Sequence, residues 1–194
     1  MIKITIGPVK SGKSKRLIDT YNNLIKNGTK TQVFSSKMSL TSGENIVSRY
    51  GTNIKAIPIS TLFDIKHHIK PDTSVILIDE FQFLDMNSKE LKLFMDKHYY
   101  DHDYCFFGLN LDYQKRPFKL MAHALCYADF IEIIGGYCDI CSGEPSKYSL
   151  RLEDGEPANI NEVGQLILLD GDYSDKKVVY KSACDKCWKE IYCG

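Results

Sequence analysis

The first two thirds of the chain alternate between short apolar runs and amphipathic stretches. Residues 2–6 place an isoleucine at every second position, which predicts a half-buried strand. Apolar residues then recur at helical spacing over 17–25, and Gly28 is a typical end for such a helix. The run 74–79 is continuously apolar between its first residue and its final aspartate, which is typical of a strand buried on both faces.

The rest of this region continues the same alternation. Strands that alternate with helices predict a parallel sheet with helices on both of its faces. Ser88 is the expected N-cap of one of these helices, because its hydroxyl can accept a hydrogen bond from a free backbone N–H group. The other predicted strands are 31–36, 55–60, 104–109 and 129–135, and the other predicted helices are 61–69, 88–99 and 118–128.

The character of the chain changes after Gly135. The remaining residues contain paired cysteines, many turn residues, and short β-like runs at 165–169 and 177–182. We therefore expect two domains, an α/β core over 1–135 and a small domain over 136–194.

Composition narrows the class of protein. Apolar residues make up 43% and charged residues 26% of the chain, with a formal net charge of zero, as in soluble globular proteins. Residues 1–135 hold 18 Lys and Arg against 14 Asp and Glu, and residues 136–194 hold 7 against 11, so neither part has the basic excess of a nucleic-acid surface. No secretory signal or membrane-spanning run is visible, so we expect a cytoplasmic protein with reduced cysteines that binds neither nucleic acid nor membranes.

The segment after the first predicted strand fits the Walker A pattern, Gly-x4-Gly-Lys-Ser. Its glycines let backbone N–H groups turn inward around a phosphate, and the following helix directs the positive end of its dipole at the same anion. Lys13 is expected at the β- and γ-phosphates, and Ser14 on Mg²⁺. The predicted phosphate site consists of Gly7, Pro8, Val9, Lys10, Ser11, Gly12, Lys13 and Ser14.

Two acidic residues follow the buried run 74–79. Asp79 ends the predicted strand, where a Walker B carboxylate holds the Mg²⁺ coordination shell. Glu80 is expected near the γ-phosphate, where its carboxylate could take a proton from water in an ATPase or from a substrate hydroxyl in a kinase. The pair alone does not decide between these two reactions.

Four cysteines form two Cys-x2-Cys pairs separated by a long segment. A two-residue spacer lets both thiolates of a pair face one metal ion, and four thiolates complete a closed structural zinc site. Such a site would hold together the base of the intervening segment. Cys105 and Cys126 lie on apolar segments and are expected in the core. The predicted zinc ligands are Cys138, Cys141, Cys184 and Cys187.

These features together resemble the thymidine kinase family of the cellular and bacterial type. The resemblance rests on GPVKSGKS, DEFQF, GLNLDYQKRPF and the two cysteine pairs, in the family's order and over nearly the whole chain. It implies a RecA-like P-loop sheet and a zinc domain whose long segment is the family's lasso, a loop that closes over the base. It also implies transfer of the γ-phosphate of ATP to the 5′-hydroxyl of thymidine or deoxyuridine, in pyrimidine deoxynucleotide salvage.

The same resemblance implies roles for single residues. Glu80 would be the general base, while Lys13, Ser14 and Asp79 would hold MgATP, and Zn²⁺ would be structural. The family is usually a homotetramer that is inhibited by its end product, dTTP. The positions that match the nucleoside pocket are Val9, Gln82, Phe83, Leu109, Tyr113, Phe118, Ser149, Leu168 and Tyr180.

The chain also departs from the family's pattern. The Asp-x-Arg stretch after the second strand is missing, and Lys37 or Arg49 are candidate substitutes for its arginine. Asn110 replaces an aspartate, Asp170 replaces a glycine of the lasso, and the stretch 172–179 is longer than the family's by about five residues. Because the lasso changes concern the nucleoside end, an altered acceptor specificity is one alternative.

Two other classes of function compete with this interpretation. A zinc-containing P-loop ATPase acting on nucleic acid would need a basic groove, whereas residues 136–194 are acidic overall. A catalytically weak nucleotide-binding relative would have no need of Glu80 beside the γ-phosphate.

Overall fold

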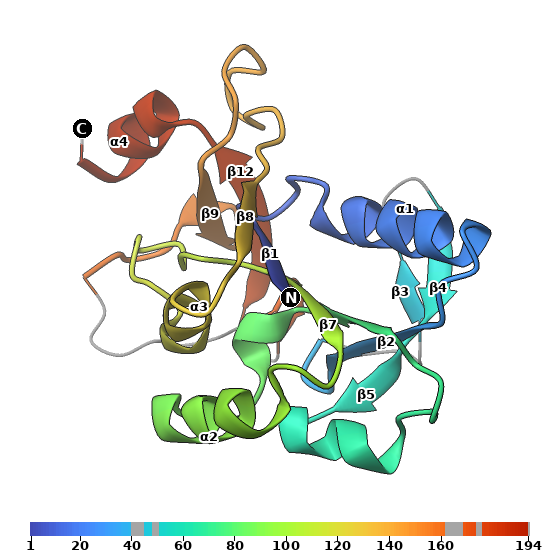
Figure 1. The fold of residues 1–194 in the computed structure, drawn as a ribbon. Coiled ribbons are helices and arrows are strands. Elements are labelled where there is room, and N and C mark those ends of the chain that lie inside the picture. The colour runs from blue at the N-terminus through green and yellow to red at the C-terminus, as the bar shows by residue number, and fades with distance from the viewer. Residues whose placement is uncertain (40–44, 48–50, 162–168, 174–175, 194) are drawn as a thin grey trace.

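The structure is a computed structural model that describes residues 1–39, 45–47, 51–161, 169–173 and 176–193. Within these residues, six parallel strands form the central sheet in the order β5-β2-β6-β7-β1-β8 (Figure 1). The strand before the Walker A loop and the strand that ends at Asp79 are not neighbours, because β7 lies between them. The strands are β1 (Ile2–Ile6), β2 (Thr31–Ser36), β5 (Ile57–Ile59), β6 (Val75–Asp79), β7 (Asp103–Gly108) and β8 (Phe130–Ile133).

Helices cover both faces of this sheet, as Figure 1 shows. Helix α1 (Lys13–Lys26) packs on one face, where Leu17 meets Leu77 and Phe107. Helices α2 (Ser88–His98) and α3 (Lys119–Leu125) cover the other face with the 3-10 helices η1 (Leu62–His67) and η2 (Phe81–Phe83). The layered arrangement confirms the predicted α/β fold class.

The described part of residues 136–194 forms a second sheet, antiparallel, in the order β10-β9-β12-β11. Its long pair, β9 with β12, packs against the C-terminal helix α4, and its cluster of buried residues includes Leu150 and Trp188. The division into two domains after Gly135 stays a prediction. The elements here are β9 (Tyr148–Glu153), β10 (Glu156–Pro157), β11 (Gly171–Asp172), β12 (Lys177–Ala183) and α4 (Asp185–Cys193).

Two predicted elements are different in the structure. The predicted strand 55–60 is broken at the buried Ala56, so that β4 (Asn53–Lys55) ends before it and β5 begins after it. Strand β4 pairs with β3 (Asn45–Val47) in a hairpin that the sequence did not indicate. The predicted helix 61–69 is the shorter 3-10 helix η1, where Thr61 and Asp64 form a capping box.

Two predictions about single residues are wrong. The N-cap of α2 is Asn87 and not Ser88, because the Asn87 side chain accepts from the backbone N–H groups of Lys89 and Glu90. Cys126 is exposed, since it follows the last residue of α3 and lies off the face that this helix buries. Cys105, in contrast, is buried as predicted.

Every helix within the described ranges is too short or too polar to cross a lipid bilayer.

The centre of the core gives a prediction about stability. Phe106 on β7 is fully buried and stacks on Phe81, with ring centroids 4.3 Å apart. Phe106→Ala should lower the free energy of unfolding by about 3–5 kcal/mol, because it leaves a cavity beside Phe81. Leu93→Ala, on the exposed face of α2, is the control and should change it little. Denaturant unfolding measures both, and a loss below about 1 kcal/mol for Phe106→Ala would contradict this account of the core.

Candidate active site and metal centre

A cavity of about 1150 Å³ opens where the carboxyl ends of the central strands meet the C-terminal sheet. Its walls include the loop after β1, Glu80 after β6 and Leu109 after β7, together with Ser149 and Tyr180 from the C-terminal sheet. Ligands of parallel α/β sheets bind at this edge of the strands, because the connecting loops converge there. The predicted site residues are thus brought to one place from distant parts of the sequence.

The predicted phosphate loop leads directly into α1, which begins at Lys13. The N-cap residue is Gly12, which has no side chain to cap the helix, so the first N–H groups of α1 can serve an anion. Lys13 is buried, and its Nζ donates to the carbonyl oxygens of Gly7 at 3.1 Å and Pro8 at 2.6 Å. The loop therefore places a cation and the N-terminus of α1 at the edge of the cavity.

Asp79 lies beside this loop as a buried carboxylate, near the Ser14 side chain. Burial and the adjacent Glu80 carboxylate raise the pKa of Asp79 to about 7, against the opposing effects of Lys13 and Ser14. Its Oδ1 has no hydrogen-bond partner within the described residues. A buried carboxylate oxygen and a hydroxyl in this position fit the preference of Mg²⁺ for oxygen ligands.

Glu80 is held in place by a chain of hydrogen bonds through Gln82. The Gln82 side-chain amide donates to Glu80 Oε2 at 2.6 Å, and its Oε1 accepts from the backbone N–H of Leu109 at 2.9 Å. Gly108 makes room for this amide, because a Cβ there would stand 2.1 Å from Gln82 Oε1. Glu80 itself has a left-handed backbone with φ of 49°, a conformation that persists in non-glycine residues only when the surroundings enforce it.

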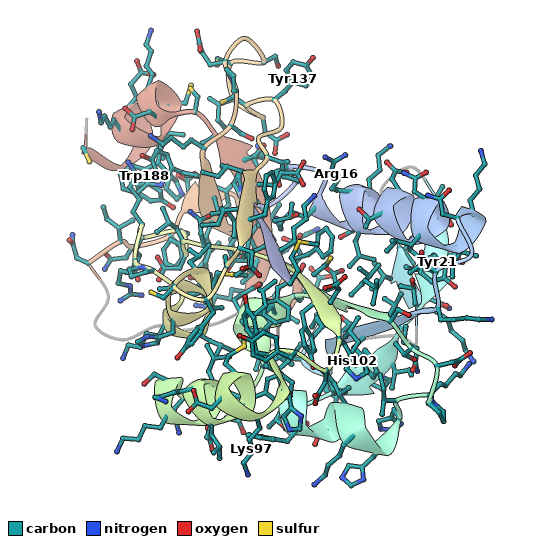
Figure 2. All side chains as sticks on the ribbon, in the orientation of Figure 1. Arg16, Tyr21, Lys97, His102, Tyr137 and Trp188 are labelled. Carbon is teal, nitrogen blue, oxygen red and sulfur yellow. The ribbon has the colours of Figure 1, made fainter. Side chains whose placement is uncertain are left out.

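Three aromatic residues, Phe83, Tyr113 and Phe118, form an aromatic wall of the cavity. Phe83 and Phe118 pack edge to face with ring centroids 5.7 Å apart. Tyr113 is anchored at both ends, since its hydroxyl donates to the Asn159 carbonyl at 3.2 Å and its own carbonyl accepts from Trp188 Nε1 at 3.2 Å. Figure 2 shows Trp188 on α4, beside the C-terminal sheet. Such a wall suits a flat heterocyclic base.

Most of the positions predicted for the nucleoside pocket border this cavity. Gln82 is not among the lining residues, but its amide donates to Glu80, which is, and its role in nucleoside binding stays a prediction. Lys37 is not among them either, while Leu168 and Arg49 lie outside the described residues. The predicted positions that line the cavity are Val9, Phe83, Leu109, Tyr113, Phe118, Ser149 and Tyr180.

The residue that departs from the family's glycine in the lasso, Asp170, also lines the cavity. Its Oδ1 accepts from the backbone N–H of Tyr180 at 2.6 Å, so the carboxylate supports the turn that precedes the tyrosine.

Charged residues that the sequence did not single out also lie at or near the cavity. Arg16 and Glu132 form an ion pair on its wall, and the hydrogen bond from Arg16 is the main reason that the pKa of Glu132 lies below its ordinary value. Arg151 is fully buried, pairs with Glu153, and lies 5.1 Å from the centre of the Tyr113 ring. No local motif marks these residues, because Arg16 meets Glu132, and Arg151 meets the Tyr113 ring, only in the tertiary fold.

The four predicted zinc ligands come together as one cluster. Their sulfur atoms all lie within 4.8 Å of one another, and those of Cys141 and Cys184 are 3.9 Å apart. Zn–S bonds of about 2.3 Å in a tetrahedron require sulfur atoms about 3.8 Å apart, so the geometry fits a zinc ion.

The pKa values of the clustered cysteines also favour a bound cation. Burial raises the pKa of Cys138, but backbone N–H groups that bond to its sulfur outweigh this effect and lower the pKa to about 6. Burial and the neighbouring thiols raise the pKa of Cys187 to about 12. Four such groups can ionise together only around a cation, and soft thiolates favour Zn²⁺. The residues present therefore fit a structural zinc site.

This cluster gives a prediction about metal content. Cys184→Ser removes one of the four sulfur ligands, so the purified protein should lose most of its zinc and melt at a lower temperature. Cys126→Ser changes an exposed cysteine outside the cluster and should keep the zinc at one ion per chain. Elemental analysis measures both variants, and full zinc content in Cys184→Ser would rule out a four-cysteine site.

Comparison with known proteins agrees with the geometry of both sites. The family model described as thymidine kinase matches residues 1–188, which is nearly the whole chain. The match spans the phosphate loop, the Asp79–Glu80 pair and the four clustered cysteines. Such enzymes are kinases that use ATP and a nucleoside, and the chain belongs to the thymidine kinase family.

Proposed function

We propose that this protein transfers the γ-phosphoryl group of ATP to the 5′-hydroxyl of thymidine or deoxyuridine. The observation that carries the proposal is that Glu80 lines the same cavity as the phosphate loop and the aromatic wall. A base between a phosphate site and a site for a flat ring is what a nucleoside kinase needs. Family membership supports the same reaction.

In this proposal, the loop between β1 and α1 binds the triphosphate. Lys13 and the first N–H groups of α1 stabilise negative charge on the phosphates. Ser14 and Asp79 would hold Mg²⁺, which neutralises charge on the phosphate oxygens when it is bound. Asp79 stands at the end of β6 and Ser14 in the first turn of α1, so the two oxygen ligands come from neighbouring elements.

The acceptor side of the reaction depends on Glu80. Its carboxylate takes the proton of the 5′-hydroxyl while that oxygen forms a bond to the γ-phosphorus and the bond to the β-phosphate oxygen breaks. Gln82 keeps the carboxylate pointing into the cavity by donating to Oε2. Phe83, Phe118 and Tyr113 then provide the surface against which the pyrimidine packs.

The proposal extends to the properties that usually accompany this family. We expect a cytoplasmic homotetramer that is inhibited by dTTP, with the lasso closing over the bound base and excluding water. Asp170 on the cavity wall is the described departure that bears most directly on acceptor choice. An ATPase stimulated by nucleic acid is the alternative, and it would release phosphate without phosphorylating a nucleoside.

The reaction itself is the first test. With MgATP, the wild-type protein should form a monophosphate from thymidine or deoxyuridine, and not from deoxycytidine, deoxyadenosine or deoxyguanosine. Glu80→Gln should lower kcat by roughly 10²–10⁴-fold while the affinity for an ATP analogue changes little, because it removes the base and keeps the shape. Glu156→Gln, on an exposed strand, is the matched control.

Two outcomes of these assays would contradict the proposal. ATP hydrolysis with no phosphorylated nucleoside would favour the ATPase. Near-normal turnover by Glu80→Gln would show that another group takes the proton.

The aromatic wall gives a prediction about substrate binding. Tyr113→Ala should raise the KM for thymidine at least about tenfold, because it removes a ring that the base packs against, while the KM for ATP stays the same. Tyr113→Phe keeps the ring and loses the bond to the Asn159 carbonyl, so its KM should change by less. Steady-state kinetics with each substrate varied separately measures both values. An unchanged KM for thymidine in Tyr113→Ala would mean that the ring packs in the core and does not contact the nucleoside.

A further inference from the structure

The segment that carries the first cysteine pair contacts the phosphate loop directly. The backbone N–H of Val9 donates to Ser149 Oγ at 3.1 Å. The Lys10 ammonium lies 3.1 Å from Asp139 Oδ2. Gly136 packs against the loop so closely that a Cβ there would stand 2.8 Å from the Lys10 carbonyl oxygen. One side of the phosphate loop is therefore formed by residues of the C-terminal part.

Asp139 has a special place among these contacts because it lies between the zinc ligands Cys138 and Cys141 in sequence. Its Oδ2 accepts from the backbone N–H of Ser182 at 2.9 Å, and its own N–H donates to the Ser182 carbonyl at 2.8 Å. Ser182 lies on β12, two residues before the third cysteine. The carboxylate that meets Lys10 is thus fixed by both halves of the metal centre.

The position of this carboxylate needs an explanation. A negative charge at the edge of a site for a polyphosphate opposes binding by simple repulsion. What Asp139 offers instead is a fixed partner for Lys10, whose backbone is left-handed with φ of 62°. A non-glycine residue keeps that conformation only when its surroundings impose it. The side chains of this ion pair are only 21% and 31% exposed, so solvent screens it less than a surface pair.

We propose that Asp139 is a positioning residue that couples the zinc site to the phosphate loop, so that zinc binding and ATP binding favour each other. With zinc bound, Asp139 is rigid and holds Lys10, and through Lys10 the loop, in the shape that receives the phosphates. Thermodynamic reciprocity then requires bound nucleotide to make zinc harder to remove, by the same factor by which zinc tightens nucleotide binding. The proposal rests on the proposed function, since it takes the loop to be the ATP site.

The test measures two binding equilibria on the zinc-loaded full chain. One is the Kd of a non-hydrolysable ATP analogue with Mg²⁺. The other is the concentration of a zinc-selective chelator that removes half of the zinc, with and without the analogue. In the wild type, the analogue should raise this chelator midpoint several-fold.

Asp139→Ala should weaken analogue binding by about threefold to tenfold and remove the effect of the analogue on the chelator midpoint. The KM for ATP should rise while the KM for thymidine stays the same. Asp139→Asn should keep part of the coupling, because an amide oxygen can still accept from Lys10 and from the Ser182 N–H group.

The second cysteine pair provides a matched control. Asp185 occupies the same place in Cys-Asp-x-Cys, but its carboxylate pairs with Lys115 and Lys189 and not with the phosphate loop. Asp185→Ala should therefore leave the Kd of the ATP analogue and its effect on the chelator midpoint unchanged.

A variant on the loop side covers the case in which Asp139→Ala loses its zinc or fails to fold. Lys10→Met keeps the aliphatic stem, leaves the cysteine segment untouched and removes the ion pair. It should retain zinc in the absence of nucleotide and should also lose the effect of the analogue on the chelator midpoint.

The outcomes are distinguishable. If the wild type binds the analogue but its zinc is equally easy to remove with and without it, the coupling is overturned and the proposed function stands. Tighter analogue binding by Asp139→Ala would also overturn it, since Asp139 would then act by repulsion alone. A wild type that binds no ATP analogue would overturn the proposed function and the coupling with it.

Discussion

The buried carboxylate of Asp79 is the constraint around which the candidate active site is arranged. An ionised group inside a protein is costly unless cations or hydrogen-bond donors compensate it. Here Lys13 and Ser14 provide part of that compensation, and one carboxylate oxygen keeps no partner within the described residues. The loop after β1 must come close to the end of β6 to do this, although β7 separates the two strands. The shape of the phosphate loop and the position of Asp79 are therefore set together.

The cysteine cluster addresses the stability of the C-terminal part of the chain. Among the described residues, the buried cluster there is small and consists of Leu150, Ala183 and Trp188 with three of the four cysteines. Small folding units with so little apolar area gain stability from a metal ion or from disulfides. The same cluster sits beside the aromatic wall, because Trp188 donates to Tyr113 and Lys115 lies 3.7 Å from the centre of the Trp188 ring. The candidate zinc site is thus connected to the residues that border the cavity.

The parts of this protein that could be predicted from the sequence are those fixed by local pattern. Periodicity and motif spacing predict the strand before the Walker A loop, helix α1 and the strand that ends at Asp79. The spacing of the cysteines predicts that the four thiols form one cluster. Helix α4 was not predicted, because the cysteine and lysine residues of the metal-binding motif obscure the apolar periodicity of this segment. The hairpin of β3 and β4 was missed because its strands are too short for a recognisable alternation.

The positions of Gln82 and Arg151 could not be predicted for another reason. The Gln82 amide has room beside Glu80 because Gly108, at the end of β7, has no side chain. Arg151 is buried on β9, which pairs with β12 and packs against α4. Such arrangements arise from residues far apart in the sequence, and no window of the chain contains them.

The place of β7 in the sheet brings the two sides of the proposed reaction together in space. The residues that face the phosphates follow β1 and β6, whereas the segment that follows β7, from Leu109 to Phe118, contributes two residues of the aromatic wall. Along the chain this segment comes after both donor strands, but in the sheet its strand lies between them. A substitution between Leu109 and Phe118 can therefore reshape the acceptor side of the cavity without changing the residues that follow β1 and β6.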